Sequence, residues 1–269
     1  SRLIKLNLKS KIKYVINRSS GLPVFTATYL YKFINFPHTP TNSAKILTYK
    51  DKLYKFFKEN FIKIPKTKIY KKTHHKISNN KIIKPAISLI GKQSVYLSNN
   101  NNLKNLQNAI KHSLNGKAIV QDFINGKNIV MYSHVIDKKL VTFEFLDEIN
   151  LRDENNKFYG KGFSIPSLNV NYNIKNQAYK IANKIIKKLK INNSPFLISF
   201  IVLKNELYLI EIHLDIGGDM IIEHLLKKSS KINFFNLIFN MYTNDRYDKY
   251  KINFKPSIML FEKENNPKI

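Results

Sequence analysis

The chain has 269 residues, of which 43% are apolar, so it can bury one large hydrophobic core or two moderate ones. It holds 46 Lys and Arg against 18 Asp and Glu, a net charge of +28, and no Cys, which excludes disulfides and thiolate chemistry. The sequence contains no run of about 18 apolar residues, which is the length that a membrane-spanning helix needs. The first residues carry neither Met nor an apolar signal core, so we expect a soluble, cytoplasmic protein.

The positive charge comes almost entirely from Lys, because only four of the basic residues are Arg. Lys, Asn and Ile share A/T-rich codons, and all three are abundant along the whole chain, which indicates genome bias. The alternative interpretation is a polyanion-binding surface. Nucleic-acid sites favour clustered Arg, so we do not expect a nucleic acid as partner.

The N-terminal part of the chain alternates extended and helical patterns. In order, we expect a short strand at 11–16, a helix at 22–34, a Pro-rich turn at 35–42, a pair of amphipathic helices at 43–62 that Ser43 caps, and an extended segment at 63–70.

The remainder mixes helices with hairpins. We expect a strand within 79–90, a helix at 101–114 with Leu103, Leu106, Ile110 and Leu114 on its buried face, a buried strand at 117–124, a hairpin at 127–146 that turns at 137–139, a helix at 176–191, a hairpin at 195–212 that turns at 204–205, and one or two helices at 223–242. Regular strand–helix alternation is missing, so the pattern predicts an α+β fold with antiparallel sheets.

The stretch "LYLIEIHLDIGGDM" (207–220) places acids and a His at the end of a buried strand. Strand alternation puts Glu211, His213 and Asp215 on one face. Such a group suits a divalent metal, and carboxylates favour Mg²⁺, although His is a softer ligand. The alternative is a strand end that exposes its charges to solvent.

Two other segments suggest nucleotide binding. In "KIIKPAISLIGKQ" a strand ends at Lys84 and is followed by a small-residue loop with Ser88 and Gly91, an arrangement that can hold phosphates. A chance match is the alternative, since Lys is common here. The segment "IVQDFINGKN" (119–128) is typical of hinges that hold adenine, and equally of an ordinary turn after a strand.

The order of these segments, preceded by "YKDKLYKFFKENFIKIPKT" (49–67), resembles the ATP-grasp superfamily over residues 13–242. The resemblance implies an α+β ATP-grasp fold with two subdomains, a mobile lid and an antiparallel core. The implied parts are a reduced pre-grasp segment at 1–44, an N-terminal grasp part with the lid at 45–120, and a C-terminal core at 121–269.

The resemblance also implies roles for individual residues. Lys52 and Lys84 bind nucleotide phosphates, Ser88 and Gly91 belong to the lid loop, Gln121, Asp122, Phe123 and Ile124 hold adenine, Asn128 lies at the ribose, Glu211 and His213 bind metal, and Arg152 and Lys161 supply charge at the reacting phosphate.

Four positions depart from the family pattern. Asn128 replaces an acid, His213 replaces an Asn, Asp215 replaces an Arg, and the upstream metal-binding acid falls near Ser199. Both a divergent enzyme with a rearranged metal site and a non-catalytic relative remain open.

The function implied by the resemblance is an ATP-dependent ligase that joins a carboxylate to an amine or thiol through an acyl phosphate and releases ADP and phosphate. Its cofactors are ATP and Mg²⁺, with Mn²⁺ as an alternative ion, and its substrates are small molecules. A homodimer, or a partner that supplies the missing N-terminal domain, fits the reduced first segment. The alternative function is a basic nucleic-acid-binding module in which the aromatics of "YLYKF" and "KLYKFF" stack on bases. Their helical spacing favours core packing instead.

Overall fold

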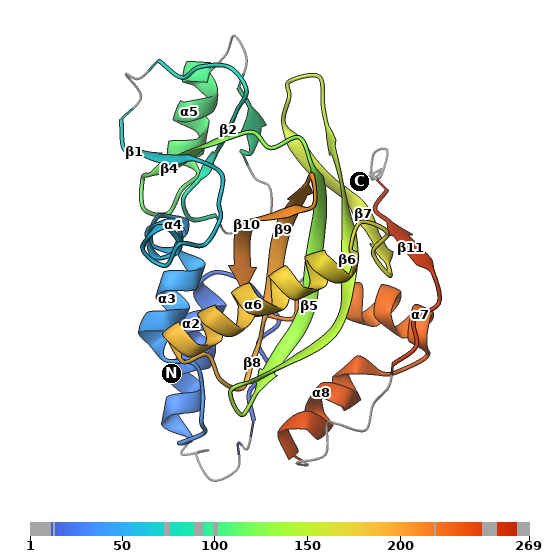
Figure 1. Ribbon diagram of the computed structural model, residues 1–269. Helices are drawn as coiled ribbons and strands as arrows, with labels where there is room; N and C mark the ends of the chain where they lie inside the picture. The colour runs from blue at the N-terminus through green and yellow to red at the C-terminus, as the bar shows by residue number, and fades with distance from the viewer. Residues whose placement is uncertain are drawn as a thin grey trace, which may run out of the picture.

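The computed structural model describes residues 12, 14–72, 76–88, 94–98, 102–217, 219–243 and 252–262. Its backbone forms two antiparallel sheets with helices packed against them (Figure 1). The smaller sheet lies with helix α5 (Asn102–Lys111) at one end of the molecule, and the larger sheet is crossed by helix α6 (Tyr172–Leu189). The predicted α+β class with antiparallel sheets is therefore confirmed.

Three helices precede the first sheet: α2 (Leu22–Phe33), α3 (Thr41–Thr48) and α4 (Lys50–Glu59). The predicted helix at 22–34 and the helix pair are confirmed. The predicted cap is wrong, because α3 begins at Thr41 directly after Pro40, whose fixed φ suits a helix start, and Ser43 is buried inside the helix.

The strand expected at 11–16 is also wrong for the residues described there. Ile12 and residues 14–20 lie in no helix or strand. Asn17 ties this segment to the residues that follow strand β10 (Glu206–His213). The Asn17 carbonyl accepts a hydrogen bond from the Ile216 N–H (3.1 Å), and Asn17 Nδ2 donates to the Leu214 carbonyl (3.1 Å).

Three of the aromatic residues in these first helices face the core. Tyr31, Tyr54 and Phe57 are 5%, 3% and 0% exposed, so they cannot stack on the bases of a nucleic acid, whereas Tyr29 is 54% exposed. For the three buried rings, the helical spacing reflects packing.

The smaller sheet has the strand order β1-β4-β2-β3. Its strands are β1 (Thr67–Tyr70), β2 (Lys81–Pro85), β3 (Tyr96–Leu97) and β4 (Ala118–Asp122). Because β4 ends at Asp122, the domain boundary expected after residue 120 falls inside this strand.

Helix α5 (Asn102–Lys111) covers one face of the smaller sheet. The predicted helix is confirmed, but its predicted buried face is partly wrong. The contact with the sheet runs through Asn105, Leu106 and Ala109, whereas Leu103 and Leu114 are more than half exposed. At 100° per residue, Leu103 lies on the flank of this contact face rather than at its centre.

The larger sheet has the order β10-β9-β5-β6-β7-β11, with β8 paired to β5. Its strands are β5 (Lys127–Ile136), β6 (Lys139–Arg152), β7 (Phe158–Ile165), β8 (Ser194–Pro195), β9 (Leu197–Leu203), β10 (Glu206–His213) and β11 (Ser257–Leu260). Both predicted hairpins are confirmed. Their turns, 137–138 and 204–205, have two successive positive φ angles, as two-residue hairpin turns require.

Helices cover both faces of the larger sheet. Helix α6 (Tyr172–Leu189) begins where the Asn171 side chain accepts a hydrogen bond from the Ile174 N–H (2.9 Å), and it packs on one face through residues spaced three or four apart. The π-helix η1 (Ile221–Leu226), α7 (Lys227–Ser230) and α8 (Phe234–Thr243) pack on the other face. Within the described residues, no helix is long and apolar enough to cross a membrane.

Strand β5 lies in the middle of the larger sheet and buries His134 completely. Within the described part of the chain neither ring nitrogen has a hydrogen-bond partner, and burial lowers the pKa of His134 to about 3. The ring packs against Phe143 and Tyr242, so this histidine is a neutral core residue.

We expect His134 to make the fold sensitive to acid. An unfolded His has a pKa of about 6.5, so between about pH 6.5 and 3 the unfolded chain takes up a proton that the folded chain does not, and stability falls as the pH falls through this window. Urea unfolding near pH 7 and near pH 5 should show a smaller loss of stability for His134→Leu than for the parent. The exposed His112→Leu is the control. Equal losses in the parent and His134→Leu would show that His134 is not the group responsible.

Candidate active site

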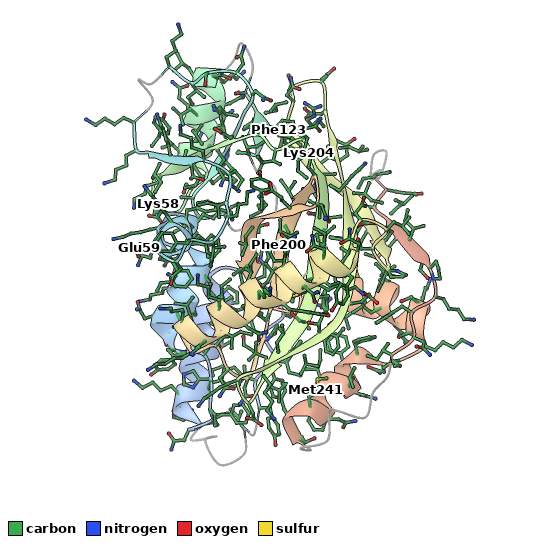
Figure 2. All side chains as sticks on the ribbon, viewed as in Figure 1. Lys58, Glu59, Phe123, Phe200, Lys204 and Met241 are labelled. Atoms are coloured by element: carbon green, nitrogen blue, oxygen red, sulfur yellow. The ribbon has the colours of Figure 1, made fainter. Side chains whose placement is uncertain are left out.

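A cavity of about 410 Å³ lies where the two sheets meet. It is lined by residues from α3 and the start of α4, from β2 and the segment after β4, and from β6, β9 and β10. Figure 2 labels two of them, Phe123 at the junction of the sheets and Phe200 on the larger sheet. A larger hollow beside β11 is lined mainly by apolar side chains and contains none of the predicted site residues that the structure describes.

Glu211 on β10 is one of the carboxylates that line this cavity. Lys50 Nζ from α4 lies 3.2 Å from its Oε2, and His213 Nε2 lies 3.3 Å from its Oε1. Burial would raise the pKa of Glu211, but the charges of Lys50, His213 and Lys84 outweigh burial and hold that pKa well below its usual range. The site therefore contains an ionised carboxylate with cations from three separate elements.

The pKa of His213 responds to the same contacts. Burial would lower it, but the neighbouring carboxylates of Glu211 and Asp215 outweigh burial and raise it. The imidazole is thus stabilised in its protonated form, as an ion-pair partner of Glu211.

Lys84 reaches the cavity from the other sheet, where it is the penultimate residue of β2 and 6% exposed. Burial lowers its pKa to about 8, and the charge of Glu211 partly offsets this effect. Its Nζ lies 5.5 Å from the centre of the Tyr54 ring. The Tyr54 hydroxyl is within hydrogen-bonding distance of the Ile210 carbonyl (2.9 Å) and Gln121 Oε1 (3.2 Å), so this ring joins α4 to both sheets.

The predicted adenine hinge follows β4 and lines the cavity. Gln121 donates through Nε2 to Thr67 Oγ1 (2.9 Å), and Asp122 pairs with Lys81 (2.6 Å), so both polar side chains are engaged by the protein. Beyond them, the rings of Phe123 and Phe158 lie 6.3 Å apart and both line the cavity, as does Ile124. This apolar wall suits a flat aromatic ligand.

Gly126 lets the chain pass closely over β9 as it enters the larger sheet. A Cβ at this position would lie 2.4 Å from the Val202 carbonyl oxygen and 2.5 Å from Ile201 Cγ2. Asn128 follows on β5, opposite Ile201, and lines the cavity.

Of the remaining predicted site residues, some line the cavity and others do not. Ser88 and Arg152 line the cavity. Lys52 and Lys161 do not: Lys52 Nζ lies 5.2 Å from the Tyr49 ring centre, and Lys161 Nζ donates to the Phe261 carbonyl (3.0 Å). Gly91 lies outside the described residues.

Sequence reasoning missed Lys50 and selected Lys52 from the same "KDK" stretch. The signal that distinguishes them is the buried face of α4, which contains Leu53, Tyr54 and Phe57. Lys50 precedes Leu53 and Tyr54 by three and four residues and so shares their face, whereas Lys52 lies on another side of the helix.

A divalent metal is the cofactor that the resemblance implies, and Glu211 fits it. No three His, Asp or Glu side chains in the described part of the chain gather closely enough to hold an ion by themselves, and Ser199, near which the resemblance implies a metal-binding acid, lies opposite Glu211 in the β9–β10 register. One carboxylate plus phosphate oxygens is nevertheless a sufficient ligand set for Mg²⁺. His213 fits less well, because its Nε2 already contacts Glu211.

Comparison with known proteins identifies the class. The ATP-grasp domain family matches residues 48–216, which is more than half of the chain, so the chain belongs to this family. The predicted family and fold are therefore confirmed. A search of curated protein sequences finds no match.

Several solved structures share the fold at low sequence identity. N5-carboxyaminoimidazole synthetase from Staphylococcus aureus, complexed with ADP, superposes with a TM-score of 0.72 at 14% identity and covers 97% of this chain and 68% of its own. The biotin carboxylase domain of Hydrogenobacter thermophilus 2-oxoglutarate carboxylase, complexed with MgADP and bicarbonate, superposes with a TM-score of 0.68 at 16% identity. This match covers 96% of this chain and 60% of the other. L-amino acid ligase from Bacillus licheniformis superposes with a TM-score of 0.65 at 17% identity, and the match covers 81% of this chain and 53% of the ligase. The chain thus spans about half to two thirds of the length of these proteins.

We expect Gly126→Ala to destabilise the protein by about 1–3 kcal/mol, the usual cost of overpacking, because the added methyl group meets the Val202 backbone carbonyl as well as the Ile201 side chain. The measurement is the free energy of unfolding in urea. Asn125→Ala, at the exposed neighbouring position, is the control. If the two variants are equally stable, the contact between Gly126 and β9 does not constrain the hinge.

Proposed function

We propose that the protein is an ATP-dependent ligase that joins a small-molecule carboxylate to an amine through an acyl phosphate. The observation that carries the proposal is the convergence of Lys84 and Lys50 on one cavity, from two different parts of the fold, beside the ionised Glu211. Membership of the ATP-grasp family supports it. So does the likeness in fold to an L-amino acid ligase and to a D-alanine–D-alanine ligase from Helicobacter pylori.

In this proposal ATP lies across the junction of the two sheets. The adenine ring packs against Phe123, Ile124 and Phe158, and backbone groups after β4 meet its polar edge. The triphosphate then extends towards Lys84 and Lys50, whose ammonium groups act as point charges for phosphate oxygens. We place the hinge between the two grasp parts after Asp122, where β4 ends, with residues 45–122 as the lid part and the chain from Phe123 as the core.

The reaction has two steps. An oxygen of the carboxylate attacks the γ-phosphorus of ATP, the bond to the β–γ bridging oxygen breaks, and ADP leaves with the electron pair of that bond. The amine nitrogen then attacks the acyl carbon, phosphate leaves, and the nitrogen loses a proton. Lys50, Lys84 and, at the rim, Arg152 neutralise the charge on the transferring group, which is the main catalytic task in phosphoryl transfer. Mg²⁺ or Mn²⁺, held by Glu211 together with phosphates, would supply Lewis-acid stabilisation of the same oxygens.

Nucleotide binding should depend on Lys50 and Lys84 but not on Lys52. Replacing either of the first two by Ala removes a charged contact to phosphate worth about 1.5–3 kcal/mol, which corresponds to a loss of affinity of about ten- to hundredfold. Calorimetric titration with Mg²⁺-ATP measures this loss. Lys52→Ala is a matched control two residues away on α4, and its affinity should equal that of the parent. The proposal fails if all three variants bind ATP alike, or if the parent does not bind ATP at millimolar concentration.

The acyl phosphate can be tested with hydroxylamine, which attacks such intermediates to give hydroxamates. With ATP, Mg²⁺ and a panel of carboxylates, we expect one carboxylate class to give hydroxamate together with an equal amount of ADP, and Lys84→Ala to give neither. ADP release without hydroxamate from any carboxylate would contradict a ligase and indicate a different phosphoryl acceptor.

A further inference from the structure

Asp215 follows strand β10 at the end of the cavity beyond Glu211. It is 2% exposed and lines the cavity together with Ser20 and Gly21. Its Oδ1 accepts a hydrogen bond from the Gly217 N–H (2.9 Å), whereas its Oδ2 has no hydrogen-bond partner among the residues that the structure describes. A buried carboxylate oxygen without a donor is costly, so its persistence calls for a physical explanation.

The polar groups around Asp215 do not supply the missing donor. His213 Nδ1 lies 3.9 Å from Oδ2, which is too far for a hydrogen bond, and its Nε2 faces Glu211. The Tyr132 hydroxyl donates to the Ile216 carbonyl (2.6 Å), and Asn17 Nδ2 donates to the Leu214 carbonyl. These neighbouring donors are therefore committed to backbone oxygens.

The charged groups that act on Asp215 are of both signs. Burial has the largest effect and raises the pKa of Asp215; the charge of His213 and the hydrogen bond from Gly217 oppose this effect, and the charges of Asp219 and Glu211 add to it. The cavity is thus lined both by the cationic side chains of Lys50 and Lys84 and by the carboxylate of Asp215.

We propose that Oδ2 of Asp215 binds the ammonium group of the amine substrate, so that the ligase selects substrates bearing a primary ammonium over carboxylates or neutral hydroxyl compounds at this end of the cavity. An ammonium supplies the missing hydrogen bond together with a positive charge, whereas a hydroxyl supplies the hydrogen bond alone. This inference rests on the proposed function for the identity of the substrate. The Asp215 subsite itself rests on the structure of the cavity alone.

The test uses the Gly217 amide, which donates to the same carboxylate, as a reporter. The protein labelled with ¹⁵N-glycine is titrated with methylammonium chloride, with methanol, and with tetramethylammonium chloride, a cation that has no N–H. We expect the Gly217 amide resonance to shift saturably with methylammonium only. In Asp215→Asn, which keeps the shape of the side chain and removes its charge, the response should be at least about tenfold weaker, as for loss of a charge-assisted hydrogen bond.

Three results would overturn the subsite: no response of Gly217 in the parent, the same response to methanol or tetramethylammonium as to methylammonium, or an unchanged response in Asp215→Asn. The parent alone decides the first two, so they do not depend on the folding of the variant. A parallel ATP titration of the parent separates the two proposals. If ATP binds and methylammonium does not, the subsite is wrong and the proposed nucleotide site stands. If methylammonium binds and ATP does not, the proposed nucleotide site is wrong and the Asp215 subsite stands.

Discussion

The contact between Lys50 and Glu211 is the interaction on which the rest of the site depends. It links the start of helix α4 to strand β10, and the charge of Lys84 reaches the same carboxylate from the smaller sheet. A carboxylate in this cavity requires compensating cations, because burial without them would neutralise it or destabilise the fold. The result is a set of charges that exists before any ligand arrives. If these charges bind phosphate as proposed, their preorganisation reduces the reorganisation that binding would otherwise cost.

The neighbouring packing keeps these charges in place. The N–H of Lys50 donates to the Ala86 carbonyl (3.2 Å), and Lys117 pairs with Asp51 (2.6 Å), so the start of α4 is fixed to the smaller sheet next to Lys84. Tyr54 fixes the same helix to β10. The two sheets are thus joined through α4 as well as through the close passage at Gly126.

Local signals made much of this fold predictable, and long-range contacts account for what was missed. Both hairpins and helix α6 follow from two-residue turns and apolar periodicity. Strand β7 was missed because Gly160 and Gly162 interrupt its pattern, and a Cβ at Gly162 would lie 2.0 Å from the Met259 carbonyl oxygen of β11, a contact that the sequence does not reveal. The site was predictable as an ordered set of motifs, with Lys84 and Glu211 both on the cavity. The choice between Lys50 and Lys52, and the unpartnered oxygen of Asp215, depend on which helix face and which strand end are buried, and both are set by tertiary packing.

The most direct test of the account is a crystal structure with a non-hydrolysable ATP analogue and Mg²⁺. We expect the adenine against Phe123 and Phe158, and phosphate oxygens within hydrogen-bonding distance of Lys50 Nζ and Lys84 Nζ. Nucleotide bound in the hollow beside β11, or bound at the junction with its phosphates directed away from both lysines, would contradict the assignment of this cavity as the active site.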